Sequence, residues 1–275
     1  MPELPETETI ARDLDGAIRG RQIKKVSIKK ADVLREVSAR TFAKRVRDAR
    51  IVRSWRRAKL VVLELDTGDR IVVQPRFTGA LLIDDGKLKQ SELNYSTMKF
   101  ELDDGRALHY SDVRRLGTVA LMDADRFDEY TSQLGIEPLD RAFSDTHLSA
   151  VLRATSQPVK KVLMEQRKIA GIGNIYANEA LWRARIDPSR PAASVTLEEA
   201  ALLRSSIVDV LKEAIAARGT SFRDYRDARG ERGGFVEKLD VYGRSGLPCH
   251  RCGSKLIATH AIDGRSTVMC VKCQH

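Results

Sequence analysis

The chain begins with the residues MPELPE, and these residues could do chemistry once Met1 is removed. Removal, which the small residue at position 2 favours, leaves Pro2 as a secondary amine beside the carboxylates of Glu3 and Glu6. An α-amine has a pKa of about 8, so part of it is unprotonated at neutral pH. Such an amine forms a Schiff base with a carbonyl-like carbon. The same residues also suit an ordinary helix start, because proline fits the first turn and acids favour its positive end.

The cysteines form a second group with a chemical pattern. All four follow the spacing C-x2-C-x17-C-x2-C at the end of the chain. In a reducing compartment this clustering indicates a metal site and not disulfides. Two such pairs complete a tetrahedral Zn²⁺ site, and a site closed by four thiolates is structural and not catalytic. The predicted ligands of one zinc ion are Cys249, Cys252, Cys270 and Cys273.

Two further segments have the composition of phosphate-binding sites. Between the cysteine pairs, the sequence predicts a two-stranded ribbon whose Asp263-Gly264 turn carries Arg265. A basic ribbon tip can bind nucleic acid, although a turn arginine is also common on ordinary surfaces. In GIGN at 171–174, small residues precede a helix that starts near Asn174, and exposed backbone amides there can bind an anion. Lys160 lies shortly upstream and favours the phosphate interpretation over simple packing.

Three short segments combine basic and exposed-looking apolar side chains. Lys59 lies in WRRAKLVVLEL, where it alternates out of phase with the apolar residues of a predicted strand. SDVRRLG supplies Arg114 and Leu116, and QPRFTG supplies Phe77 in a predicted loop. Apolar wedges beside arginines are what a protein needs to unstack a base and fill the gap. A solvated sheet face would also explain the Lys59 segment, and taken singly such apolar side chains more often pack in a core.

The elements that position these residues indicate an α+β fold. An N-terminal helix presents Ile10, Leu14 and Ile18 on one face, and short strands without intervening helices follow from about 20 to 122. They predict an antiparallel sandwich or barrel. From 158 to 218 the pattern is helical, and the last helix opens with a Thr196–Glu199 capping box. The predicted domains are 1–130 (β-sandwich), 131–245 (helical) and 246–275 (zinc module).

The composition favours a polyanionic partner. Lys and Arg number 48 against 38 Asp and Glu, which gives a net charge of +10. This charge favours nucleic acid, and a basic helix with an apolar face for a membrane surface is missing from the sequence. The N-terminus is acidic where a signal peptide would be basic, so we expect a cytoplasmic protein. We also expect a monomer that associates with the nucleoid when it acts on DNA.

These segments, in this order, resemble the formamidopyrimidine-DNA glycosylase family, which repairs 8-oxoguanine and is related to endonuclease VIII. The resemblance covers essentially the whole chain. The matching segments are PELPE, RRAK, the Asp-Arg-Arg segment, GIGNIYANEALW, VYGR-x-G-x-PC and the two CxxC pairs. It implies an N-terminal helix with a β-sandwich, a helix–two-turn–helix domain with a lesion-capping loop at 219–238, and a zinc finger.

The resemblance also implies a role for each site residue. Pro2 is the nucleophile, Glu3 the acid that opens the sugar, and Glu6 a supporting carboxylate. The implied reaction removes oxidised purines from duplex DNA and cleaves the strand by β,δ-elimination. The other implied residues touch DNA: Lys59 at the damaged site and a phosphate, Asn174 and Arg265 at the flanking phosphates, Lys160 nearby, Arg114 at the orphaned cytosine, and Phe77 and Leu116 as wedges.

The wedge departs from the family pattern, which commonly has methionine where Phe77 stands and phenylalanine where Leu116 stands. PELPE favours the oxidised-purine branch, because the endonuclease VIII branch carries PEGPE. Two alternatives stay open at this point. One is an oxidised-pyrimidine glycosylase of the endonuclease VIII type, and the other is a non-catalytic module that binds damaged DNA.

Overall fold

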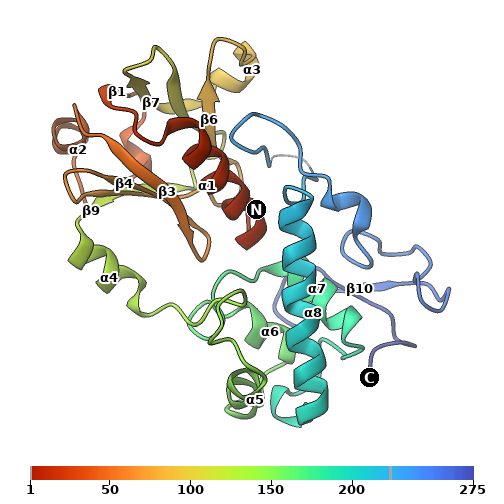
Figure 1. Cartoon of the computed structure of the whole chain (residues 1–275). Helices are drawn as coiled ribbons and strands as arrows, with labels where there is room; N and C mark the ends of the chain where they lie inside the picture. The colour runs from red at the N-terminus through yellow and green to blue at the C-terminus, as the bar shows by residue number, and fades with distance from the viewer. Residues whose placement is uncertain (1, 223–224) are drawn as a thin grey trace. The chain divides into compact units, whose positions relative to one another are not determined.

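The structure, a computed structural model, describes residues 2–222 and 225–275, so residues 223 and 224 of the implied capping loop lie outside it. The chain forms two compact units. The first unit combines Met1–Ser132 with Ala217–Val236, so a segment from late in the chain packs with the N-terminal residues. The second unit combines Gln133–Ala216 with Glu237–His275. Figure 1 shows the strands of the first unit in red to yellow and the helices of the second in green to cyan.

The first unit contains two β-sheets, as the sequence predicts. One sheet has four antiparallel strands in the order β1-β7-β8-β6, with bounds Ile23–Ile28, Ser96–Leu102, Ala107–Asp112 and Gly79–Asp84. The other has five strands in the order β2-β9-β5-β4-β3, with bounds Leu34–Arg35, Thr118–Met122, Arg70–Gln74, Leu60–Leu65 and Ile51–Arg57. Only the short β2 pairs in parallel, with β9, among the strands that the structure describes. The mixed α+β fold with antiparallel sheets is therefore confirmed.

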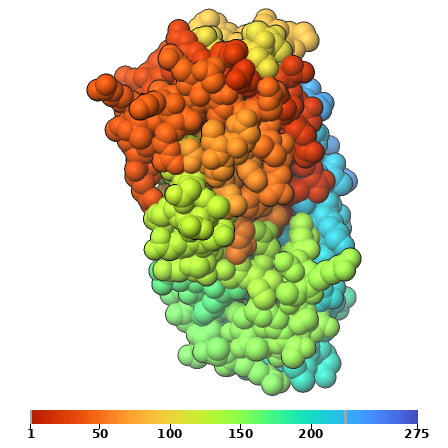
Figure 2. All heavy atoms as spheres, turned by 60° about the vertical axis from the view of Figure 1, so that its left-hand side comes forward, coloured from red at the N-terminus to blue at the C-terminus, as the bar shows by residue number. Residues whose placement is uncertain are grey.

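The N-terminal helix α1 (Leu4–Ile18) closes the core of this unit. Its predicted stripe of Ile10, Leu14 and Ile18 is fully buried, in one cluster with side chains from both sheets. Each such side chain contributes about 1.5–3 kcal/mol when it leaves water. Helix α4 (Ala124–Ser132) covers a second cluster through an edge-to-face contact of Trp55 with Phe127, whose ring centroids lie 5.4 Å apart. Figure 2 shows α4 as a yellow-green patch against the orange strands.

One prediction for this unit is wrong. No helix was expected between 20 and 122, but α2 (Ala39–Val46) lies there, as does the single-turn α3 (Gln90–Leu93). Helix α2 forms because the Ser38 hydroxyl accepts a hydrogen bond from the Thr41 amide at 3.1 Å and caps the first turn. Phe42 and Val46, four residues apart, then bury the same face.

The second unit is helical, as predicted. Its helices are α5 (Asp145–Arg153), α6 (Val159–Met164), α7 (Asn174–Arg183) and α8 (Leu197–Ala216), with a 3₁₀ turn at Ala192–Ser194. A further 3₁₀ turn, Phe235–Lys238, includes the last residues of the first unit and the residues where the chain re-enters the second. The predicted capping box is present: the Thr196 amide donates to Glu199 Oε2 at 2.8 Å, and the Glu199 amide donates to Thr196 Oγ1 at 3.2 Å. The predicted ribbon consists of β10 (Ile257–Thr259) and β11 (Thr267–Met269), which pair antiparallel.

Candidate active site

The N-terminal residues lie in the interior of the first unit. Pro2 is buried and Glu3 is 2% exposed; Glu3 adopts extended backbone as the N-cap residue of α1. Its amide donates to Glu6 Oε2 at 2.8 Å. The helix-start interpretation is confirmed, since Pro5 occupies the first turn. Pro2 therefore directly precedes the N-terminal end of α1, next to Glu3 in the chain.

The Glu6 carboxylate connects the N-terminus to the late segment of the first unit. The side chain of Glu6 is 1% exposed, and Oε1 accepts a hydrogen bond from the Thr220 amide at 2.7 Å. Tyr225 packs beside it and donates from its hydroxyl to Arg218 O at 3.2 Å. Burial, and then the charge of Glu6, raise the pKa of Tyr225 well above its ordinary value, so its hydroxyl keeps its proton. Glu6 therefore holds Thr220 beside the N-terminus, with Tyr225 as a neutral neighbour.

Lys59 lies in the turn between β3 and β4, not in a strand as predicted. Ala58 in this turn has a φ of 52°, in the left-handed region, so the extended backbone of β3 ends before Lys59. Ala58 O accepts from Thr7 Oγ1 at 3.3 Å and from Arg56 Nη1 at 3.0 Å. These bonds place the half-buried Lys59 beside the first turn of α1.

A salt bridge holds the same turn. Arg56 Nε donates to Glu8 Oε2 at 2.8 Å, and the side chain of Arg56 is only 8% exposed. Burial raises the pKa of Glu8, but the hydrogen bonds and charges of Arg56 and Arg12 outweigh it and lower that pKa below its ordinary value. Glu8 is thus ionised at neutral pH and fixes the turn that carries Lys59.

The predicted wedge residues lie on two neighbouring loops. Phe77 and Leu116 are each 46% exposed, so neither side chain belongs to the core. The Arg114 guanidinium carbon lies 5.9 Å from the centroid of the Phe77 ring. The structure thus brings Phe77 and Arg114 together, and Leu116 follows Arg114 in the same loop.

In the second unit, a hydrogen bond from Asn174 holds Ser266, the residue that follows Arg265. Asn174 is the first residue of α7, and its Nδ2 donates to Ser266 O at 2.9 Å. Arg265 precedes Ser266 and is exposed. Asn178, one turn further along α7, accepts from the Val268 amide at 2.8 Å. The amide side chains of α7 therefore hold the strand that follows Arg265.

Lys160 is placed differently from the other predicted DNA contacts. Its side chain is 0% exposed, and its Nζ donates to Thr267 Oγ1 at 2.7 Å and lies 3.4 Å from Asp263 Oδ1. The Asp263 carboxylate also accepts from the Arg265 amide at 3.1 Å. In this structure Lys160 supports the turn that carries Arg265.

The four predicted metal ligands are gathered in one cluster. The sulfur atoms of Cys249, Cys252, Cys270 and Cys273 all lie within 4.8 Å of one another. A tetrahedral zinc with Zn–S bonds of about 2.3 Å places its sulfur atoms about 3.8 Å apart, so the donor set fits this ion.

The carboxylate of Glu179 on α7 accepts from the amides of Asp240, Val241 and Tyr242, at 2.8, 3.0 and 2.8 Å. Sequence reasoning missed Glu179, because the three amides lie far from it in the chain.

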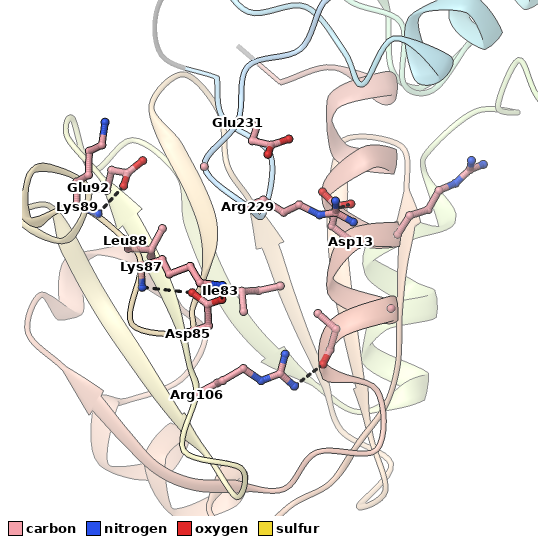
Figure 3. Close-up of a pocket in the computed structure, with 14 residues that line it drawn as sticks. Asp13, Ile83, Asp85, Lys87, Leu88, Lys89, Glu92, Arg106, Arg229 and Glu231 are labelled. Atoms are coloured by element: carbon pink, nitrogen blue, oxygen red, sulfur yellow. Dashed lines mark hydrogen bonds and ion pairs between the residues drawn. The ribbon is translucent and has the colours of Figure 1, made fainter.

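A pocket of about 760 Å³ in the first unit lies apart from these residues. Figure 3 shows Arg229 reaching toward Asp13 on α1; their nearest side-chain atoms are 3.8 Å apart. Asp13 also binds Arg218, whose Nη2 lies 2.6 Å from Asp13 Oδ2 and also donates to Asp227. One part of the pocket wall, residues 229–231, therefore belongs to the late segment that these ion pairs anchor to α1. None of the predicted catalytic residues is among the described residues that line the pocket.

Comparison with known proteins identifies relatives over the whole chain. The model of the formamidopyrimidine-DNA glycosylase N-terminal domain matches residues 1–119, and that of the formamidopyrimidine-DNA glycosylase H2TH domain matches 134–226. A formamidopyrimidine-DNA glycosylase of Heliobacterium modesticaldum is 42% identical over 277 residues, and the alignment covers 100% of both proteins. One from Pelotomaculum thermopropionicum is 39% identical, with 100% of this chain and 99% of that protein covered.

Two solved structures share the fold. The MutM (Fpg) protein of Thermus thermophilus superimposes with a TM-score of 0.87 at 34% identity, over 99% of this chain and 98% of that one. A Lactococcus lactis Fpg mutant, in complex with DNA that contains Fapy-dG, gives a TM-score of 0.92 at 29% identity, with 100% of both chains covered. Among the described residues, no helix is long and apolar enough to cross a membrane. On these matches, the chain belongs to the formamidopyrimidine-DNA glycosylase family.

Proposed function

We propose that this chain removes oxidised purines, such as 8-oxoguanine and formamidopyrimidines, from duplex DNA and then cleaves the strand. Its family membership makes it a DNA glycosylase. The observation that carries the proposal is the buried Pro2 at the start of α1, flanked by two buried carboxylates in Glu3 and Glu6. The Lactococcus lactis relative, solved with DNA that contains Fapy-dG, supports the purine class.

The reaction begins when the target nucleotide is flipped out of the duplex, because its glycosidic bond cannot be reached in the stack. With Met1 removed, the Pro2 nitrogen attacks C1′ of the sugar and the glycosidic bond breaks. The proton released from the proline nitrogen leaves on the base. Glu3 donates a proton to the ring oxygen and the sugar opens to a Schiff base. Met1 itself lies outside the described residues.

The Schiff base then leads to strand cleavage. Its positive charge acidifies the C2′ hydrogen, whose loss expels the 3′ phosphate; a second elimination expels the 5′ phosphate. The product is a gap of one nucleotide with a phosphate at each end. Lys59, held beside the first turn of α1, supplies a positive charge for a phosphate at the damaged site.

The remaining residues bind and shape the DNA. Asn174 and Arg265 hold the phosphates that flank the flipped nucleotide, and Lys160 contributes through the turn that carries Arg265. Arg114 pairs with the orphaned cytosine, and Phe77 and Leu116 fill the vacated space. A bend in the DNA costs several kcal/mol by elastic estimates (about 1–6), which contacts made only in the bent form offset. The zinc ion supplies no chemistry here; the four cysteines would hold it to stabilise the ribbon.

Borohydride trapping tests this function. The purified protein is incubated with a duplex that contains 8-oxoguanine opposite cytosine, reduced, and mapped by mass spectrometry. We expect a DNA adduct on Pro2. The matched control carries one alanine inserted between Met1 and Pro2, which turns the proline nitrogen into an amide and should abolish the adduct on that proline.

Other outcomes separate the alternatives. An adduct that forms only with oxidised pyrimidines such as thymine glycol would place the chain with the endonuclease VIII type. Binding without any adduct, by a protein whose mass shows a free Pro2, would overturn the enzymatic proposal in favour of a binding module.

A further inference from the structure

The buried carboxylate of Asp112 lies at the end of β8, between the two loops that carry the wedge residues. It is 2% exposed. Three groups donate to it: the Thr78 hydroxyl to Oδ1, the Gly117 amide to Oδ2 at 2.8 Å, and the Tyr110 hydroxyl to Oδ2 at 3.2 Å. Thr78 follows Phe77 and Gly117 follows Leu116, so one carboxylate holds the residue next to each wedge.

A second bond connects the two loops directly. The Thr78 hydroxyl accepts from the Arg114 amide at 3.0 Å while it donates to Asp112. This relay fixes the backbone of Arg114, whose guanidinium lies beside the Phe77 ring. The three exposed side chains of the wedge are therefore held by one hydrogen-bonded network with Asp112 at its centre.

The two loops need such a support because their backbones are strained. Arg76, which precedes Phe77, and Arg115, which precedes Leu116, both have a φ of 53°. This left-handed conformation is unfavourable for residues with a side chain and persists only where the surroundings impose it. A Cβ at Gly117 would lie 2.0 Å from the Tyr110 hydroxyl, so the loop also packs closely on the Asp112 network.

We propose that Asp112 is a positioning residue that holds Phe77, Arg114 and Leu116 as one rigid unit for insertion into the duplex. This inference rests on the proposed function, because it assigns Asp112 to the step in which the damaged base leaves the stack. Burial, and then the charge of Asp112, raise the pKa of Tyr110 well above its ordinary value, so the hydroxyl stays a donor to the carboxylate. Asp112 touches no reacting atom and acts only through the loops.

The test compares Asp112→Asn with Asp69→Asn. The first variant replaces one of the two carboxylate oxygens by an amide nitrogen that cannot accept. Either the Thr78 hydroxyl at Oδ1, or the Gly117 amide and the Tyr110 hydroxyl at Oδ2, then lose their acceptor. Asp69 is also buried, at 7% exposure, but it pairs with Arg45 away from the loops. Asp69→Asn thus reports the effect of losing a buried carboxylate of the same unit without disturbing the wedge.

The readouts separate positioning from general damage. Excision of 8-oxoguanine from duplex DNA should fall by about 10- to 100-fold in Asp112→Asn, because small misplacements of positioning groups cost this much. The preference for cytosine over adenine opposite the lesion should shrink. Cleavage of an abasic site in single-stranded DNA needs no wedge and should stay within about twofold of the wild type. Asp69→Asn should leave all three readouts near the wild-type values.

A pair of variants at Thr78 gives an independent arm. Thr78→Val removes the hydroxyl and should reproduce the Asp112→Asn pattern, whereas Thr78→Ser keeps the hydroxyl and should restore the opposite-base preference. Equal losses on duplex and single-stranded substrates in Asp112→Asn, or an unchanged cytosine preference in both Asp112→Asn and Thr78→Val, would overturn the inference. A wild-type protein that cleaves neither substrate would instead refute the proposed function.

Discussion

The Glu6 carboxylate accepts the Thr220 amide through one oxygen and the Glu3 amide through the other, at 2.7 and 2.8 Å. One side chain thus joins the start of α1 to a segment more than two hundred residues later in the chain. Both donors are backbone groups, so the bonds fix main-chain positions and not mobile side chains. The arrangement couples the position of the proposed nucleophile to that of the segment proposed to cap the lesion.

We predict that Glu6→Gln separates base excision from strand cleavage. A glutamine keeps one acceptor oxygen, so one of the two buried amides loses its partner, at a cost of about 1–3 kcal/mol. Excision of 8-oxoguanine should slow by at least about tenfold, because it needs the segment that contains Thr220 to lie over the base. Cleavage at a preformed abasic site should change much less. Single-turnover rates on both substrates check this, and equal slowing on both would contradict it.

The Arg218 guanidinium anchors the same segment through buried charges. It bridges Asp13, whose side chain is 6% exposed, and Asp227, whose side chain is 0% exposed. Arg218→Gln leaves both carboxylates without this partner, and we expect a loss of about 2–3 kcal/mol in the free energy of unfolding, below the range for a fully buried pair. Urea denaturation measures it. Arg19→Gln, which breaks an exposed helical pair with Asp15, is the control and should cost at most about 0.5 kcal/mol.

Local patterns in the sequence predicted much of this structure. The Thr196–Glu199 capping box, the hydrophobic stripe of α1 and the ribbon between the cysteine pairs each depend on residues within one helix or hairpin. Helix α2 was missed because it has only eight residues, fewer than the roughly 11–18 over which a helical period is judged, although Phe42 and Val46 lie on one face.

Long-range contacts could not be predicted in this way. Glu6 with Thr220, Asp112 with Thr78 and Glu179 with Val241 pair residues that no local spacing relates. Only the folded chain shows that a carboxylate predicted as a helix start also holds a distant loop. The burial of Lys160 is of the same kind, since its partners Thr267 and Asp263 lie in the ribbon.

The Glu8–Arg56 pair gives the stability a defined pH dependence. The pKa of Glu8 is lowered in the folded protein from an ordinary value of 4.5. A carboxyl group whose pKa is depressed by folding contributes stability above the unfolded pKa and loses it as pH falls through the folded one. We therefore expect the difference between wild type and Glu8→Gln to be about 1–2 kcal/mol at pH 7. It should shrink steadily below pH 4.5.

Urea unfolding of both proteins between about pH 3 and 7 measures this difference. Glu64→Gln is a suitable control, because Glu64 pairs with Arg53, whose side chain is 51% exposed. That pair should contribute at most about 1 kcal/mol. A Glu8→Gln difference that stays constant down to the lowest pH would rule out the pair as its cause.

Gly117 and Gly16 allow the same substitution to be tested in two environments. A Cβ at Gly117 meets the Tyr110 hydroxyl at 2.0 Å and Gln74 O at 2.8 Å, whereas one at Gly16 meets nothing within 4 Å. Gly117→Ala should therefore destabilise by about 1–3 kcal/mol. Gly16→Ala, near the end of α1, should stabilise by about 0.5–1 kcal/mol, because alanine favours a helix. Thermal unfolding of both variants shows whether the signs are opposite.

The cysteine cluster predicts how metal removal acts. The four cysteines could hold one metal ion. A zinc ion held there by four thiolates would have no open position, so it would be structural, and its binding free energy would stabilise the folded ribbon. Chelation, or Cys273→Ser, should release about one equivalent of zinc and weaken binding to duplex DNA by at least about tenfold, because the turn with Arg265 loses its support. The first unit contains Pro2, Glu3 and Lys59, so borohydride trapping on an abasic site should persist at high DNA concentration. Zinc release and fluorescence anisotropy on one sample check both parts. Retained DNA affinity in the metal-free protein would mean that the ribbon does not contribute to binding.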